Sequence, residues 1–91
     1  MELEVNTHPN NLGKRIGIEL SKRSIILKND DGLEKEVAPL VYIIWRKCNG
    51  SNSVEDILEY VVQRTKKPKD FVKNVVFDIL EDLKATSFVS Y

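Results

Sequence analysis

The stretch from Leu33 to Asn49, LEKEVAPLVYIIWRKCN, constrains the fold most, because it changes from a strand pattern to a helix pattern at one point. Up to Val37 the pattern is that of a short charged strand, with Leu33, Lys35 and Val37 on one face and Glu34 and Glu36 on the other. Pro39 then suits the first position of a helix, where a missing N–H costs nothing, and Gly50 suits a left-handed cap after Asn49. The sequence therefore predicts a short strand followed directly by a helix from Pro39 to Asn49.

The apolar residues of this first helix recur at helical spacing and cover most of its circumference. They are Leu40, Val41, Ile43, Ile44, Trp45 and Cys48. Trp45 is the only tryptophan, and its place on the stripe predicts a core residue. Cys48 lies on the same stripe, so we expect an inert buried thiol rather than a nucleophile.

The residues before this junction predict a three-stranded antiparallel meander. Ile16, Ile18 and Leu20 alternate with polar residues from position 14 to 20, a pattern typical of a half-buried strand. A second strand follows at 24–28, and the turn Asn29-Asp30-Asp31-Gly32 leads into a third at 33–37. Residues 1–13 contain a polar run with a proline, and we expect them to form a flexible arm.

Two more helices follow the first. Ser53 with Asp56 three positions later predicts a capped start for the second helix. The third is predicted to run from Pro68 to about Ala85, with Phe77 on its polar side. Its predicted apolar face consists of Phe71, Val72, Val75, Val76, Ile79, Leu80 and Leu83. Phe88 and Val89 are placed to form a short final strand.

This order of elements predicts one α+β domain over residues 14–91, in which an N-terminal three-stranded antiparallel sheet precedes a three-helix bundle, a winged-helix-like arrangement with its sheet first. The chain has 91 residues, which leaves room for one modest core. Its 14 basic and 14 acidic residues cancel, which argues against nucleic acid or an anionic membrane as partner. One cysteine and no basic, apolar leader favour a reducing cytoplasm.

The motifs that carry chemistry are missing from the sequence. His8, the only histidine, has no nearby cysteine or spaced carboxylates, so we expect no metal site and no catalytic dyad. The four glycines are spread along the chain, so no glycine-rich loop is present to hold a phosphate-bearing cofactor. We therefore expect a protein without catalytic residues, metal or cofactor.

Several motifs together resemble the PqqD family. They are Ile44-Trp45, the turn Cys48-Asn49-Gly50, the run Ser53-Val54-Glu55-Asp56-Ile57, and a long last helix that ends in Leu83-x-x-x-x-Phe88-Val89. The resemblance covers residues 14–91. The chain departs from the family pattern at Val37-Ala38, where Leu-Asn is typical, so it has no side-chain cap there, and at Val41, where a small residue is typical.

The resemblance implies a recognition element for RiPPs (ribosomally made, post-translationally modified peptides), which acts as a peptide chaperone. The leader peptide of a precursor adds as a strand to the third strand and lies against the third helix, and a modifying enzyme of the radical-SAM type is the second partner. Carried over to this chain, the strand wall consists of Leu33, Glu34, Lys35, Glu36 and Val37. The helix wall consists of Asp70, Lys73, Asn74, Phe77 and Glu81.

Two alternatives stay open beside this interpretation. The charges on strand 33–37 are also what proteins use to keep an edge strand from pairing with other chains. A winged-helix DNA-binding protein is the other, although positions 69–84 carry three lysines against four acidic residues, the wrong sign for a helix that enters a groove of DNA.

Overall fold

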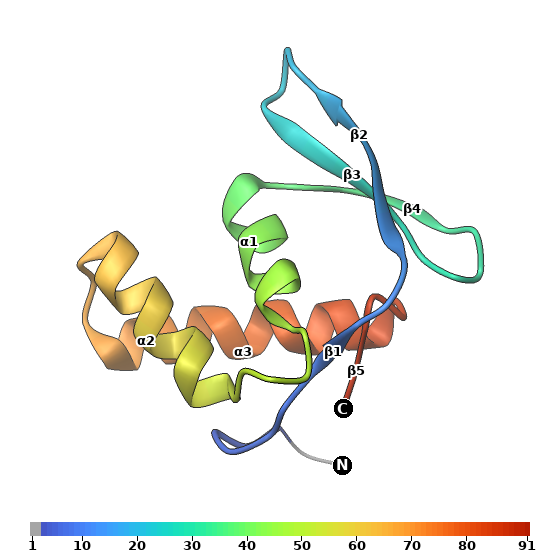
Figure 1. Cartoon of the computed structure of the whole chain (residues 1–91). Coiled ribbons are helices and arrows are strands. Elements are labelled where there is room, and N and C mark those ends of the chain that lie inside the picture. The colour runs from blue at the N-terminus through green and yellow to red at the C-terminus, as the bar shows by residue number, and fades with distance from the viewer. Residues whose placement is uncertain (1–2) are drawn as a thin grey trace.

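A computed structural model describes residues 3–91, so Met1 and Glu2 at the start of the expected arm lie outside it. Its order of elements begins with strands and continues with helices (Figure 1). The strands are β1 (Asn10–Asn11), β2 (Lys14–Glu19), β3 (Ser24–Lys28), β4 (Glu34–Val37) and β5 (Val89–Ser90). The helices are α1 (Pro39–Lys47), α2 (Val54–Thr65) and α3 (Lys69–Ala85).

The predicted α+β meander is confirmed. The strands β2, β3 and β4 form an antiparallel sheet in that order, so β3 is central and both β2 and β4 have a free edge. Figure 1 shows this sheet above α1 and α3, with the β2–β3 end projecting beyond the helices. A bulge between Arg15 and Gly17 interrupts the pairing of β2 with β3, whereas β3 and β4 pair regularly.

The core lies where β3, β4 and the three helices meet. Ile44 and Trp45 of α1 are buried as predicted, and so is Cys48 just beyond the helix. The remaining buried apolar residues are Leu27, Val37, Val54, Ile57, Leu58, Val61, Val72, Val76, Leu80, Leu83, Phe88 and Val89. Tyr42 and Tyr60 are partly buried against it.

Most helix ends follow local signals, although α3 begins at Lys69 and the predicted first residue, Pro68, is its N-cap. Pro39 occupies the start of α1, and Ser53 and Asp56 form a full capping box at α2, both as predicted. The expected end of α1 at Asn49 is wrong, because the helix stops at Lys47 and Cys48 is its cap. Gly50 does have positive φ, +83°, but it serves a bend at which a Cβ would collide with the side chain of Asn10.

Residues 5–13, within the arm expected to be flexible, are hydrogen bonded to the domain. The first two amides of α2 donate to this segment at 2.8 Å, that of Val54 to the carbonyl of Thr7 and that of Glu55 to the carbonyl of Val5. Helices leave such amides unpaired, so this segment satisfies them. Farther along, β1 pairs with β5, and Pro9 is fully buried. The final strand predicted near Val89 is confirmed, and β1 is its partner.

The alternation at positions 16, 18 and 20 predicted a half-buried strand, but these apolar residues are exposed. Ile16, Ile18 and Leu20 are 43%, 51% and 82% exposed. The β2–β3 end of the sheet projects beyond the helices, so no helix covers it there (Figure 1). Period-two alternation identifies a strand, but burial also needs an element on its apolar side.

Candidate functional site

A groove of about 300 Å³ lies between β4 and α3. Lys35, Glu36, Val37 and Ala38 line one side, Asp78, Ile79 and Asp82 line the α3 side, and Val41 of α1 completes it. Val37 is buried and Val41 and Ile79 are half-buried, so the floor is apolar while the rim carries charges. A floor and rim of this kind suit a side chain of an extended peptide better than a small polar metabolite.

The register of the sheet shows which backbone groups of β4 are free. The amide of Asn29 donates to the carbonyl of Leu33 at 2.9 Å, so the backbone of Leu33 faces β3. Backbone groups alternate in direction along a strand, and β4 pairs with β3 without a shift. Those of Lys35 and Val37 therefore also face β3. The N–H and C=O groups of Glu34 and Glu36 face the open edge.

An ion pair joins the two walls of the groove. The ammonium of Lys35 on β4 contacts the carboxylate of Asp82 on α3. Lys35 is paired with buried Leu27 of β3, and residues paired across strands share a face, so its side chain is on the helix side of the sheet. This partly exposed contact bridges strand and helix at one end of the groove.

The structure brings together only part of the site predicted from the sequence. Of the expected strand wall, Lys35, Glu36 and Val37 line the groove, whereas Leu33 and Glu34 do not. The residues of the expected helix wall do not line it; they are Asp70, Lys73, Asn74, Phe77 and Glu81. Phe77, predicted to be exposed, is partly buried against the core, and the ammonium of Lys73 lies 5.5 Å from the centre of its ring.

The residues that do face the groove follow a pattern that sequence reasoning missed. Positions 71, 75, 78, 79 and 82 are spaced i, i+4, i+7, i+8 and i+11, which places them on one flank of α3. Three of them line the groove. Phe71 on this flank is 56% exposed, although we predicted it in the core. It is in the first turn of α3, and helical side chains lean toward the N-terminus, so its ring extends past the helix end.

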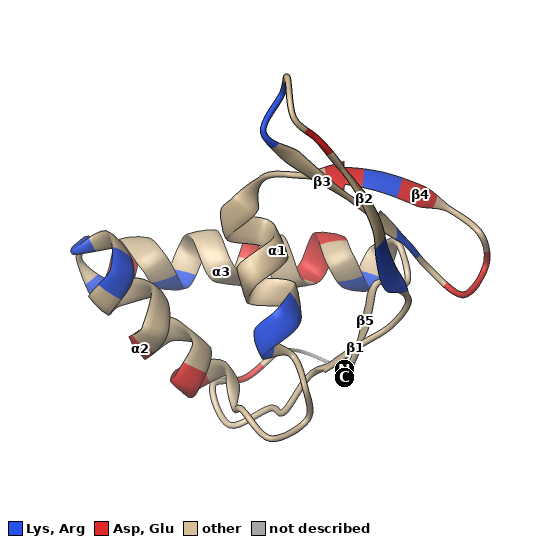
Figure 2. Ribbon diagram, turned by 45° about the horizontal axis from the view of Figure 1, so that its top comes forward, with Lys and Arg blue, Asp and Glu red and all other residues tan. Residues whose placement is uncertain are grey.

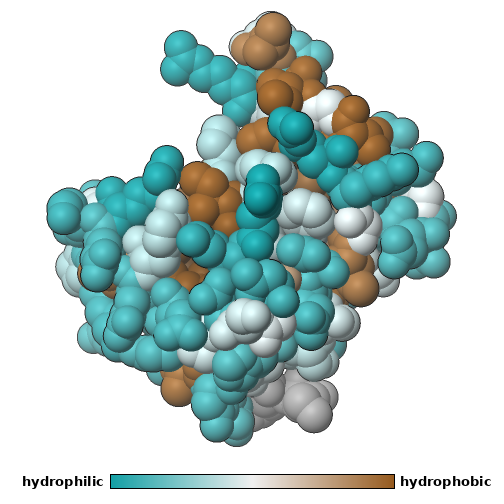
Figure 3. Space-filling view, viewed as in Figure 1, coloured by the Kyte–Doolittle hydropathy of each residue, from teal (hydrophilic) through white to brown (hydrophobic). Residues whose placement is uncertain are grey.

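The second free edge of the sheet, at β2, carries the exposed apolar residues Ile16 and Ile18, and exposed Leu20 follows directly after the strand. Brown side chains gather on this projecting part of the molecule in Figure 3. The bulge after Arg15 disturbs the regular spacing of backbone groups along β2. Bulges of this kind discourage the pairing of a further strand, so β4 offers the better edge.

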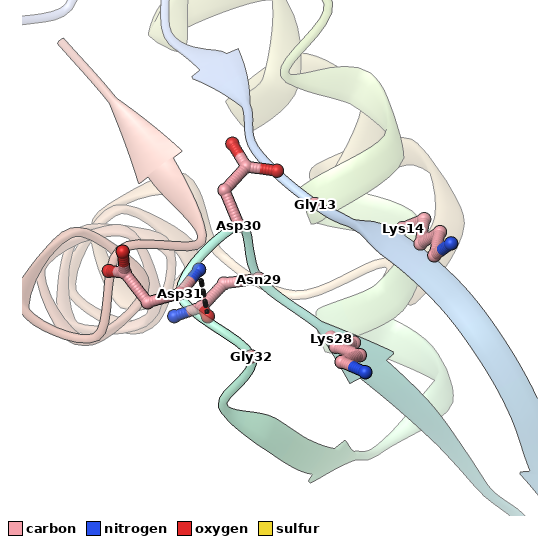
Figure 4. A pocket seen from close by; sticks show the side chains of 7 residues that line it. All are labelled: Gly13, Lys14, Lys28, Asn29, Asp30, Asp31 and Gly32. Carbon is pink, nitrogen blue, oxygen red and sulfur yellow. Dashed lines mark hydrogen bonds between the residues drawn. The ribbon is translucent and has the colours of Figure 1, made fainter.

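A polar hollow surrounds the turn between β3 and β4 (Figure 4). Its residues are Gly13, Lys14, Lys28, Asn29, Asp30, Asp31 and Gly32. Asn29 is buried, accepts at its Oδ1 from the amides of Asp31 and Leu33, and donates from Nδ2 to the carbonyl of Thr86 at 2.8 Å. The hollow is thus the outer surface of a turn that Asn29 fastens to the end of α3.

The groups whose chemistry suits a nucleophile or a metal ligand are poorly placed for either role. Burial raises the pKa of the Cys48 thiol to about 12, and its Sγ donates to the carbonyl of Ile44. His8 is exposed. Within residues 3–91, no cluster of three or more His, Cys, Asp or Glu side chains is arranged to hold a metal ion. None of the helices formed by these residues is long and apolar enough to cross a membrane.

Comparison with known proteins adds no relative, since no family model, no curated protein and no solved structure matches this chain.

Proposed function

We propose that this protein is a non-catalytic peptide-binding module of the cytoplasm. It captures the leader of a ribosomally made precursor peptide by strand addition and presents it to a modifying enzyme of the radical-SAM type. This is the function that the resemblance to the PqqD family implies. The observation that supports it best is the regular free edge of β4 beside the apolar floor of the groove.

The binding mode follows from the free backbone groups. A leader strand hydrogen bonds to the outward N–H and C=O of Glu34 and Glu36, which form no bond to β3 by the register. Alternate side chains of that strand then point to the helix side of the sheet, over Val37, Val41 and Ile79. The backbone bonds supply affinity for any extended segment, and the groove supplies the selectivity.

The test is an NMR titration with the leader of a short peptide encoded beside the gene or, where there is none, with a peptide selected from a random display library on the folded domain. We expect amide shifts at Glu34–Val37 and along positions 75–82 of α3. Glu36→Pro removes an outward N–H and is expected to weaken binding at least tenfold, because one proline at an edge deletes a peptide bond donor without opening the sheet.

The matched control is the same substitution at the other free edge, Ile18→Pro. Ile18 pairs with Ile25, whose backbone faces β4, so Ile18 also faces outward by the register. This variant is expected to bind peptide normally. Loss of binding in Ile18→Pro alone, or shifts confined to β2, would place the peptide at the wrong edge for this proposal, and failure of all these peptides to bind would contradict it.

A second candidate, nucleic-acid binding, is favoured by one observation. The β2–β3 hairpin, residues 14–28, carries five basic residues and one acidic residue, and Figure 2 shows blue segments along it. Asp70, Asp78, Glu81 and Asp82 of α3 are all exposed and have the opposite sign. A gel-shift series on random duplex DNA separates the candidates. Tight binding that weakens steeply with added salt would support the hairpin as a DNA contact, whereas a peptide module gives no such retention.

A further inference from the structure

We infer that the groove selects an extended peptide that carries an apolar side chain and a lysine or arginine two positions apart. This inference rests on the proposed function and names the class of peptide that the β4 edge takes. It depends on two further observations, namely which side of the sheet the groove occupies and which of its charges are already paired.

The spacing of two follows from the strand geometry. Side chains of an added strand share a face with the β4 residues directly opposite them. Val37 is on the helix side of the sheet, so a peptide residue opposite it and the next residue but one on either side of it also point toward α3. The residue between them points away from the groove. Two neighbouring peptide residues therefore cannot both enter.

The aliphatic floor of the groove favours an apolar residue at one of the two peptide positions. Val37, Val41 and Ile79 come from β4, α1 and α3 and lie together in the groove, next to Ala38. All of them are aliphatic, and none offers a side-chain donor or acceptor. A valine, leucine or isoleucine of the peptide covers the half-buried side chains of Val41 and Ile79 and removes apolar surface from water, whereas a polar side chain there would lose its hydration without gaining a partner.

The charge on the rim of the groove that no ion pair neutralises favours a basic residue at the other peptide position. Lys35 is engaged by Asp82, and the carboxylate of Glu36 is 3.6 Å from the ammonium of Lys22. Asp78 is exposed and forms no ion pair with any residue in the range 3–91. Figure 2 shows red segments on β4 and on the part of α3 near it. The uncompensated charge beside the floor is therefore negative, which favours Lys or Arg and disfavours Glu or Asp.

The experiment uses blocked nine-residue peptides made of threonine except at two central positions. One has valine and lysine two positions apart, a second replaces the lysine by glutamate, and a third keeps valine and lysine but makes them adjacent. Dissociation constants come from NMR titrations of the whole protein. We expect the first peptide to bind about fivefold more tightly than each of the others, as for one partly exposed ion pair. The preference for lysine over glutamate should shrink at high salt.

Charge reversal at the rim gives the matched variant. Asp78→Lys is expected to invert the preference, so that the glutamate peptide binds more tightly than the lysine peptide. Glu59→Lys changes the net charge equally at an exposed position of α2, outside the groove, and is expected to leave the preference unchanged.

The outcomes separate this inference from the proposed function. Equal binding of the three peptides with shifts at β4 would overturn the selection rule and leave strand addition standing, and so would an unchanged preference in Asp78→Lys. Absence of shifts at β4 with all three peptides at millimolar concentration would overturn both.

Discussion

The indole N–H of Trp45 donates a hydrogen bond to the backbone carbonyl of Phe88 at 2.9 Å. The bond joins α1, in the middle of the chain, to the residue just before β5. Trp45 is only 6% exposed and Phe88 is fully buried, so water does not compete for this contact. The carbonyl of Phe88 also accepts from the backbone amide of Leu12 at 2.8 Å, so the tryptophan fills the core and adds a second hydrogen bond to the same carbonyl.

Two substitutions at Trp45 separate packing from hydrogen bonding. Trp45→Ala leaves a cavity and is expected to lower the free energy of unfolding by about 3–5 kcal/mol. Trp45→Phe retains most of the apolar contact but removes one of the two hydrogen bonds to the Phe88 carbonyl, at an expected cost of about 0.5–1.5 kcal/mol. Urea denaturation followed by circular dichroism measures both, since the variants lack the fluorescent residue. A midpoint unchanged from wild type in Trp45→Ala would show that Trp45 is not part of the core.

The hydrogen bond from Asn29 to the carbonyl of Thr86 attaches the sheet to the end of α3, and a substitution at Asn29 tests it. In Asn29→Asp the two bonds that Oδ1 accepts are retained, but the donor to the Thr86 carbonyl is lost. We expect the free energy of unfolding at pH 7 to fall by about 1–3 kcal/mol, because a buried acceptor loses its partner and a carboxylate replaces the amide. Asp30→Ala, at the exposed neighbouring position, is the control and should change the stability by less than about 0.5 kcal/mol. Equal effects would contradict the role assigned to Asn29.

The capping box of α2 predicts a pH dependence of stability. Hydrogen bonds from the backbone amide and from the side chain of Ser53 lower the pKa of Asp56 below its ordinary value of 3.8. A carboxyl whose pKa is lower in the folded state stabilises the protein above its unfolded pKa, and this contribution is lost as the pH falls through the folded value. Stability should therefore decrease as the pH falls below 3.8.

Substituting the cap residue isolates this contribution. Asp56→Asn is expected to reduce the loss of stability between pH 7 and pH 2 in thermal melts, and the conservative change Glu59→Gln on the exposed face of the same helix should not. Glu19, whose pKa is lowered by hydrogen bonds from Ser21, retains its own share of the acid dependence in both variants. An equal loss of stability between pH 7 and pH 2 in Asp56→Asn and in wild type would rule out this role of the cap.

Cys48 is expected to be unreactive in the folded protein. Its thiol is fully buried, and its pKa of about 12 keeps it protonated at pH 8. Iodoacetamide should therefore modify Cys48 only as fast as the domain unfolds, with a rate that rises with urea. Mass spectrometry measures the modified fraction over time. Rapid alkylation without denaturant would show that the thiol is accessible and reopen a reactive role.

The backbone N–H groups of neighbouring β4 residues point alternately toward β3 and toward the open edge. Proline substitutions at neighbouring positions should therefore lower the stability by different amounts. Lys35→Pro removes an N–H that faces β3 and also the ion pair with Asp82, so we expect a loss of about 3 kcal/mol or more. Glu36→Pro removes an N–H that faces the open edge and should cost distinctly less. Thermal unfolding of the two variants compares them directly. The reverse order would show that the assigned register of free groups is wrong.

Local signals in the sequence were sufficient for most of the elements. Pro39 at a helix start, Ser53 with Asp56 as a cap, and the turn before Gly32 each act within a few residues, and the structure confirms the elements they predict. These signals work because the backbone geometry and hydrogen bonds they govern are settled between near neighbours, whatever the rest of the chain does. The edge position of the third strand also follows, since a three-stranded meander always leaves its last strand at an edge.

Tertiary packing alone decided which surface faces the candidate site. Helical spacing identifies the buried stripe of α3, but it treats the two flanks of that stripe alike, so it could not tell that Asp78, Ile79 and Asp82 face β4 while Phe77 is on the other flank. The exposure of Ile18 and the pairing of β1 with β5 depend in the same way on distant partners. A periodic pattern records which residues share a face, and only the packed neighbours determine what that face contacts.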